Sequence, residues 1–145
     1  MRRGVALVPL LLALVVAGTA TASWQTGTYT GKLRSPGFGT RGATAIRLLV
    51  TKTHVRVLSA KLSLRCPDAK SRKAATVGPL KAVKIHVRPD TGGAQFTVNQ
   101  AVGTTRVTIA GGITPGKPLQ GLLDVTRDTP GGICTDTALF TAAPR

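Results

Sequence analysis

The feature that most constrains this chain is a period-two alternation of apolar and polar residues that begins near Tyr29 and continues almost to the C-terminus. Such alternation places every second side chain on one face of a strand, and no window shows an apolar stripe at helical spacing. Short runs rich in Thr, Val, Ile and Leu are separated by Gly, Pro, Asp and Ser, which is typical of antiparallel strands with tight connections. We therefore predict an all-β fold, a single antiparallel β-sandwich, with a small β-barrel as the alternative.

The clearest register prediction concerns residues 106–127, which form two alternating stretches around a turn at residues 114–118. Folding this hairpin about Gly116 places Gly111 opposite Gly121, with apolar pairs on one side of them: Ile109 with Leu123, and Val107 with Val125. Two facing glycines leave a slot on the core face in which an aromatic ring can lie against the backbone. The candidate rings are those of Trp24, Tyr29, Phe96 and Phe140.

A second hairpin is predicted from residues 83–88 and 95–99, with turn residues at 90–93. Its expected register places Val87 opposite Phe96. Its outward positions form a short basic stripe, which is a weak candidate for polyanion contact: Lys84, His86 and Arg88.

Other boundaries follow from the same pattern. The apolar parity changes between Val57 and Leu58, which predicts a bulge, a bend or a strand that passes between sheets. We expect the last strand at residues 136–142 and loops at residues 35–42, 67–79 and 128–132.

The first 22 residues predict a signal peptide. Arg2 and Arg3 form a positively charged start, an apolar stretch extends to Gly18, and Ala20-Thr21-Ala22 is an A-x-A cleavage sequence. The expected organisation is a signal peptide at residues 1–22 and one β-sandwich domain at residues 23–145. The mature chain has no second apolar stretch of membrane-spanning length, so we expect no transmembrane segment in it. The predicted location is secreted or extracytoplasmic, free or held at the cell surface.

Cys66 and Cys134 are the only cysteines of a chain that is addressed to an oxidising compartment. An even number of cysteines there favours a disulfide between them. There is no C-x-x-C motif for thiol exchange, and neither histidine lies at metal-ligand spacing from a cysteine. We predict a structural Cys66–Cys134 bridge.

The formal charge is +15, from 20 Lys and Arg against five Asp and no Glu. One interpretation is that the basic residues keep strand faces solvated and protect exposed edges. The other is that the summed field draws the domain to polyanions such as acidic cell-envelope polymers. No run of consecutive basic residues favours the second interpretation over the first.

The order of these features resembles a loose group of small secreted bacterial β-sandwich proteins of unknown function. The shared elements are the leader, the G-x-Y-x-G opening at residues 27–31, the two cysteines, and an aromatic-Thr-Ala ending at Phe140, Thr141 and Ala142. The resemblance implies a β-sandwich with a Cys66–Cys134 bridge. It implies no catalytic residue.

The sequence contains no clear arrangement of catalytic residues. The five Asp are scattered, the two His are far apart, and no loop gathers the acidic oxygens that calcium requires. Asp124 is the most interesting acid, but an exposed strand residue paired across the sheet with Lys or Arg is the simpler interpretation. We expect no catalytic residues, no metal site and no cofactor. Because aromatic residues are only 3% of the chain, we also expect no specific nucleic-acid binding.

Two functions remain open. The first is an exported, non-enzymatic interaction or surface-association module with weak polyanion affinity. The second is a secreted inhibitor of an extracellular hydrolase, which would present the loop at residues 35–42 or 128–132 on a rigid scaffold.

Overall fold

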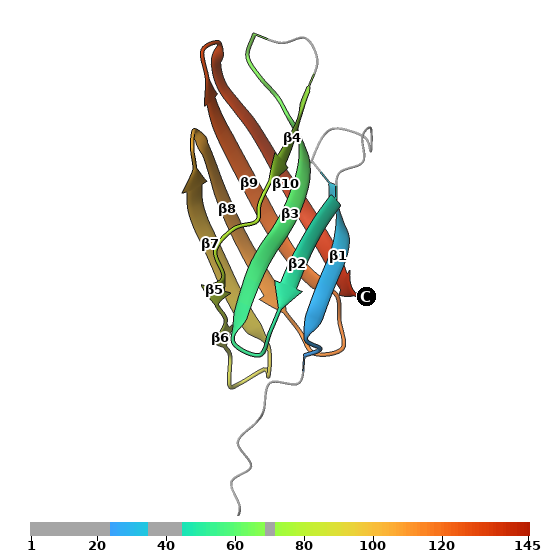
Figure 1. Ribbon diagram of the computed structural model, residues 1–145. Coiled ribbons are helices and arrows are strands. Elements are labelled where there is room, and N and C mark those ends of the chain that lie inside the picture. Colours follow the sequence, from blue (N-terminus) through green and yellow to red (C-terminus); the bar gives the residue numbers. More distant parts are fainter. Residues whose placement is uncertain (1–23, 35–44, 69–71) are drawn as a thin grey trace, which may run out of the picture.

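The computed structural model describes residues 24–34, 45–68 and 72–145 (Figure 1). The predicted signal peptide and the predicted loop at residues 35–42 lie outside these residues. The described part contains ten strands and no helix: β1 (Gly27–Arg34), β2 (Ala45–Val50), β3 (His54–Leu64), β4 (Lys73–Val77), β5 (Val83–Lys84), β6 (His86–Val87), β7 (Ala94–Val102), β8 (Thr105–Ile113), β9 (Leu119–Thr129) and β10 (Gly132–Pro144). None of the described residues forms a helix able to cross a membrane.

The prediction of an all-β, antiparallel fold is confirmed. The strands form one sheet in the order β4-β3-β2-β1-β10-β9-β8-β7-β6, and β5 pairs with β3 outside this path. The sheet is not closed into a barrel. Instead, residues 83–87 change partner along their length: β5 pairs with β3 at one end of the sheet, and β6 pairs with β7 at the other.

The core lies on the inner face of this sheet. In Figure 1, β1, β2 and β3 lie in front of β8 and β9, and the inward side chains of both halves belong to one apolar cluster. The alternation follows the sequence closely: Ile46, Leu48 and Val50 of β2 are completely buried, whereas the residues between them are exposed. Burying a side chain of this size contributes about 1.5–3 kcal/mol. The apolar parity of each strand therefore fixes which of its faces points inward.

The two facing glycines are found where the sequence predicts them. Gly111 pairs with Gly121, flanked by Ile109 with Leu123 and Val107 with Val125. The rings that use the slot are those of Phe96, which pairs with Gly111, and Phe140, which pairs with Gly121. A Cβ on Gly111 would overlap the Phe96 ring, and one on Gly121 would come within 2.6 Å of Phe140 Cζ. The two glycines thus hold two phenylalanine rings against the backbone at the centre of the inner face.

The change of parity after Val57 is also confirmed, as a bulge. Leu48 pairs with Val57 but Arg47 pairs with Ser59, so Leu58 is the extra residue on β3. The bulge lets both ends of this long strand keep their apolar side chains on the core.

Several expected boundaries are wrong. Val87 pairs with Ala94 and not with Phe96, because the turn closes through an Arg88 N–H that donates to the Gly93 carbonyl oxygen (2.7 Å). The expected loop at residues 67–79 contains β4, which adds to the edge of β3. The expected loop at residues 128–132 is a tight turn, because β9 and β10 pair up to Thr129 and Gly132. The last strand is correspondingly longer than residues 136–142.

The predicted disulfide is present and joins β10 to the segment that follows β3, a strand that is not a neighbour of β10 in the sheet. The described parts of β1 and β2 end at Arg34 and Ala45, whereas β3 and β10 extend further and meet directly. Arg65 and Thr135 exchange two backbone hydrogen bonds of 2.9 Å, and Cys66 is bonded to Cys134 immediately beside them. An Arg72–Asp136 ion pair (3.6 Å) lies at the same end, where Arg72 also donates to the Ser63 carbonyl oxygen.

The Phe96–Gly111 contact makes a stability prediction. We expect Gly111→Ala to lower the free energy of unfolding by about 1–3 kcal/mol, because the added methyl overpacks the ring. Gly112→Ala is the matched control, since a Cβ there would meet only the Ala94 carbonyl oxygen at 3.9 Å. Urea denaturation of both variants measures the difference. Equal stability of the two variants would contradict this account of the slot.

The disulfide makes a second prediction. The Cys66→Ser/Cys134→Ser double variant removes a cross-link between residues 68 positions apart. On the loop-entropy model we expect a loss of about 4 kcal/mol. Chemical denaturation with and without reductant tests this, and the double variant should respond to denaturant in the same way under both conditions. A loss below about 1 kcal/mol would show that the bridge constrains the unfolded chain far less than its span suggests.

Candidate polyanion-binding face

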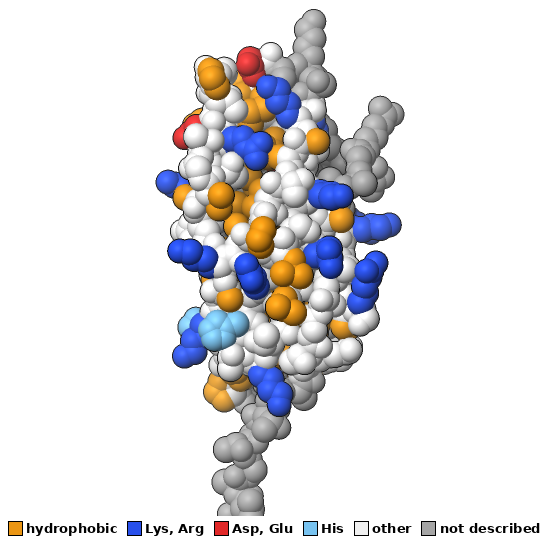
Figure 2. Space-filling model, in the orientation of Figure 1, with side chains coloured by type: hydrophobic (Ala, Val, Ile, Leu, Met, Phe, Trp, Pro, Cys, Tyr) orange, Lys and Arg blue, Asp and Glu red, His pale blue; other side chains and the backbone are white. Residues whose placement is uncertain are grey.

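The outer face of β1, β2 and β3 gathers basic side chains. The sequences of these strands contain no Asp or Glu. Their exposed basic residues, with the residue that follows β3, define what we call the basic face: Lys32, Arg34, Arg47, Arg56, Lys61 and Arg65. Figure 2 shows Lys and Arg spread over this side of the molecule, with acidic side chains only at its upper margin.

The register of the strands places these residues next to one another. Lys32 pairs with Ala45, which pairs with Lys61, so the two lysines lie in one row with a single strand between them. Arg47 is two residues from Ala45 on the same face of β2. Adjacent strands are about 4.8 Å apart and alternate residues about 6.8 Å apart. Lys32, Arg47 and Lys61 therefore form a triangle of like charges within reach of one anionic segment.

Four of these six charges are not neutralised within the described residues. Lys32, Arg34, Arg47 and Lys61 form no ion pair or side-chain hydrogen bond within the described chain. Arg56 is held in place, because its Nε donates to the Leu80 carbonyl oxygen (2.9 Å). The face thus combines one positioned guanidinium with four long side chains that are free to meet a ligand: Lys32, Arg34, Arg47 and Lys61.

In the structure, the three residues of the basic stripe predicted from sequence lie beside different strands. Lys84 on β5 lies opposite His54 at the end of β3, so it borders the basic face. His86 on β6 lies opposite Gln95 of β7, and Arg88 lies in the turn that follows. All three side chains are exposed. Because the segment changes partner at Ile85, they do not share one continuous strand pair.

The sequence interpretation missed the basic face itself. The signal was present, since each of its residues alternates with buried neighbours: Arg47 lies between Ile46 and Leu48, and Arg56 between Val55 and Val57. The alternation does not reveal the strand order β3-β2-β1. This order brings outward residues from distant parts of the sequence onto one surface.

The opposite side of the sheet has a different character. The outward residues of β9 include Asp124 and Asp128. Asp124 was expected to pair with Lys or Arg, but its Oδ1 accepts a hydrogen bond from Thr137 Oγ1 (2.9 Å), because its cross-strand neighbours are Thr108 and Thr137. The net positive charge is therefore concentrated on one side of the molecule.

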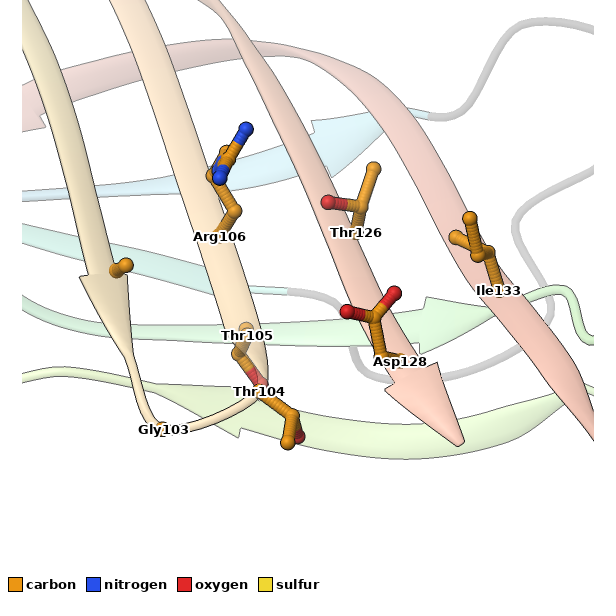
Figure 3. Close-up of a pocket in the computed structure, with 8 residues that line it drawn as sticks. Gly103, Thr104, Thr105, Arg106, Thr126, Asp128 and Ile133 are labelled. Carbon is orange, nitrogen blue, oxygen red and sulfur yellow. The ribbon is translucent and has the colours of Figure 1, made fainter. Parts of the chain in front are cut away.

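A hollow of about 270 Å³ lies at the end of β8 and β9. Figure 3 shows Arg106 of β8 beside Thr126 and Asp128 of β9, with Ile133 of β10 forming a wall. One cation and one carboxylate give this hollow a mixed charge. It is a poorer match for a polyanion than the basic face, and no group of three or more metal-ligating side chains occurs among the described residues.

A second hollow, of about 300 Å³, is lined by Trp24 and Tyr29 beside the turn between β8 and β9. Both aromatic residues are buried, and both of their polar atoms are already bonded. Trp24 Nε1 donates to the Thr51 carbonyl oxygen (3.1 Å), and the Tyr29 hydroxyl donates to the Gln25 carbonyl oxygen (2.7 Å). Burial raises the pKa of Tyr29 above 10.0. Tyr29 thus stabilises the fold in its neutral form.

Comparison of the chain with protein-family models, with curated proteins and with solved structures finds no match.

The Tyr29 environment makes a titration prediction. The chain has one tyrosine, so the near-ultraviolet absorbance of phenolate reports Tyr29 alone. We expect the folded protein to titrate above pH 10.0 and the denatured chain near that value, because burial disfavours the phenolate. Since the pKa is raised on folding, this contribution to stability is complete below the unfolded pKa and is lost as the pH rises through the folded pKa. Identical midpoints in the folded and denatured protein would contradict the assignment.

Proposed function

We propose that this protein is an exported, non-enzymatic β-sandwich module that associates with acidic cell-envelope polymers through the basic face. The observation that carries the proposal is the concentration of exposed cations on strands without a single carboxylate. Export is supported by the N-terminal leader sequence and by the disulfide, which is typical of oxidising compartments. The location and the activity both belong to the proposal.

The form of the basic face favours a polymer over a small anion. Its cations extend over three strands and both ends of β3, from Arg56 to Arg65. The polar neighbours on this face, such as Thr30 and Ser59, carry hydroxyls and no charge. An extended acidic chain can contact several of these cations at once, and such contacts weaken as salt shortens the range of the field.

A matched pair of variants tests whether the face or the net charge is responsible. Lys32→Gln/Arg47→Gln/Lys61→Gln removes three charges from the face. Lys81→Gln/Arg88→Gln/Arg106→Gln removes three exposed charges elsewhere and leaves the same net charge. Exposed ion pairs contribute about 0.2–1 kcal/mol each, so we expect the first variant to bind about tenfold more weakly at low salt. The second variant should bind nearly as well as the unaltered protein.

The measurement is retention on purified cell envelope at low and at physiological ionic strength. Binding should fall steeply between them, because the Debye length shortens from about 30 Å at 0.01 M to about 8 Å at 0.15 M salt. Equal losses in the two variants would assign binding to net charge and not to the basic face. Retention that does not respond to salt, or no retention, would overturn the proposed function.

A further inference from the structure

A hollow of about 580 Å³ on the outer face of β8, β9 and β10 adjoins the basic face. Its size is in the range of small-ligand sites. It is lined by exposed side chains of two kinds. Lys117, Thr114, Gln120 and Thr141 supply polar groups, and Leu139 with Pro118 supplies an apolar wall.

Gly112 lines the hollow and has no side chain that would occupy it. Gly112 lies on the outer face of β8, where a Cβ would meet nothing closer than the Ala94 carbonyl oxygen at 3.9 Å. In the sheet, Gly112 pairs with Gln120 and Gln120 pairs with Thr141. Thr141 pairs in turn with Lys32. These paired residues form one row across the sheet, which begins in the hollow and ends at Lys32 of the basic face.

The polar groups of the hollow are available to a ligand. The side chains of Thr114, Lys117, Gln120 and Thr141 form no hydrogen bond or ion pair within the described chain. Gln100 shows the contrast, because both ends of its amide are bonded to the backbone of Lys81 at 2.8 and 2.9 Å. Among the residues that the structure describes, no carboxylate lines the hollow. It presents neutral donors and acceptors and one cation beside an apolar wall.

This combination matches a sugar better than a simple anion. A sugar ring offers hydroxyls to the amide of Gln120 and to the threonine hydroxyls, and offers C–H groups to Leu139. A polyphosphate or an acidic polypeptide offers charge without ring hydroxyls. An acid group on the sugar would find Lys117 at the hollow and Lys32 at its border.

We propose that the hollow binds one sugar unit of an acidic polysaccharide whose neighbouring units lie on the basic face. This inference rests on the proposed function and names its ligand class. The hollow supplies selectivity for the sugar, and the basic face supplies attraction that depends on charge alone.

Two carboxylate polymers separate these contributions: polygalacturonate, which has sugar rings, and poly-L-glutamate, which has none. The unaltered protein should bind polygalacturonate more tightly at equal carboxylate concentration. Gly112→Leu places a bulky side chain in the hollow and should lower the polygalacturonate affinity about tenfold, or about 1.4 kcal/mol. The same variant should leave poly-L-glutamate binding unchanged. Ala110→Leu is the control, because it adds the same side chain two residues away on the same face of β8, outside the hollow.

A second variant, Thr141→Val, removes a hydroxyl with little change of shape and should weaken polygalacturonate binding about threefold, which is within the range of one neutral hydrogen bond. It keeps the inference testable if Gly112→Leu does not fold. Both polymers could bind in a salt-dependent way while Gly112→Leu and Thr141→Val fail to weaken polygalacturonate binding selectively. In that case the inference is wrong and the proposed function stands. If neither polymer binds at low salt, the proposed function fails as well.

Discussion

The structure depends on the burial of one face of a single curved sheet. Inward side chains from strands at both ends of the sheet form one apolar cluster, to which β1 to β4 and β7 to β10 contribute buried residues by alternation. Within this cluster, the rings of Phe96 and Phe140 lie on two paired glycines, where a Cβ would overlap them. Because the inner face is filled by apolar side chains, the outer face is left to interact with other molecules.

A disulfide and backbone hydrogen bonds connect strands at the ends and edges of the sheet. At one end, β3 and β10 extend past their neighbours and are joined by backbone hydrogen bonds and by the disulfide of Cys66 and Cys134. Along the edges, one chain segment pairs first with β3 and then with β7. These connections hold the edges of an open sheet that would otherwise offer unpaired backbone groups. The register of β1, β2 and β3 in turn brings Lys32, Arg47 and Lys61 together.

The outer surface divides by charge. Positive charge is concentrated over β1 to β3, whereas Asp124 and Asp128 lie on β9 on the other side. The hollow over Gly112 lies where the two surfaces meet, since its row continues through Thr141 to the basic face. A polymer attracted by charge would therefore pass a place where its chemistry can be distinguished. The proposed long-range attraction and the proposed short-range selectivity would thus belong to adjacent parts of one sheet.

The sequence by itself determined the strand class, the inward parity, the glycine slot of the central hairpin, the change of parity after Val57 and the cysteine pair, because each follows from local alternation or from simple counting. That the change of parity is a bulge, and not a bend or a passage between sheets, was decided by the pairing of β2 with β3. It did not determine the register of the second hairpin, the strand within residues 67–79, or which basic residues are neighbours. Those depend on the order of strands in the sheet and on how particular turns close. The alternation predicts that Arg47 and Lys61 point outward. Only the pairing of β2 with β3 determines that they point outward side by side.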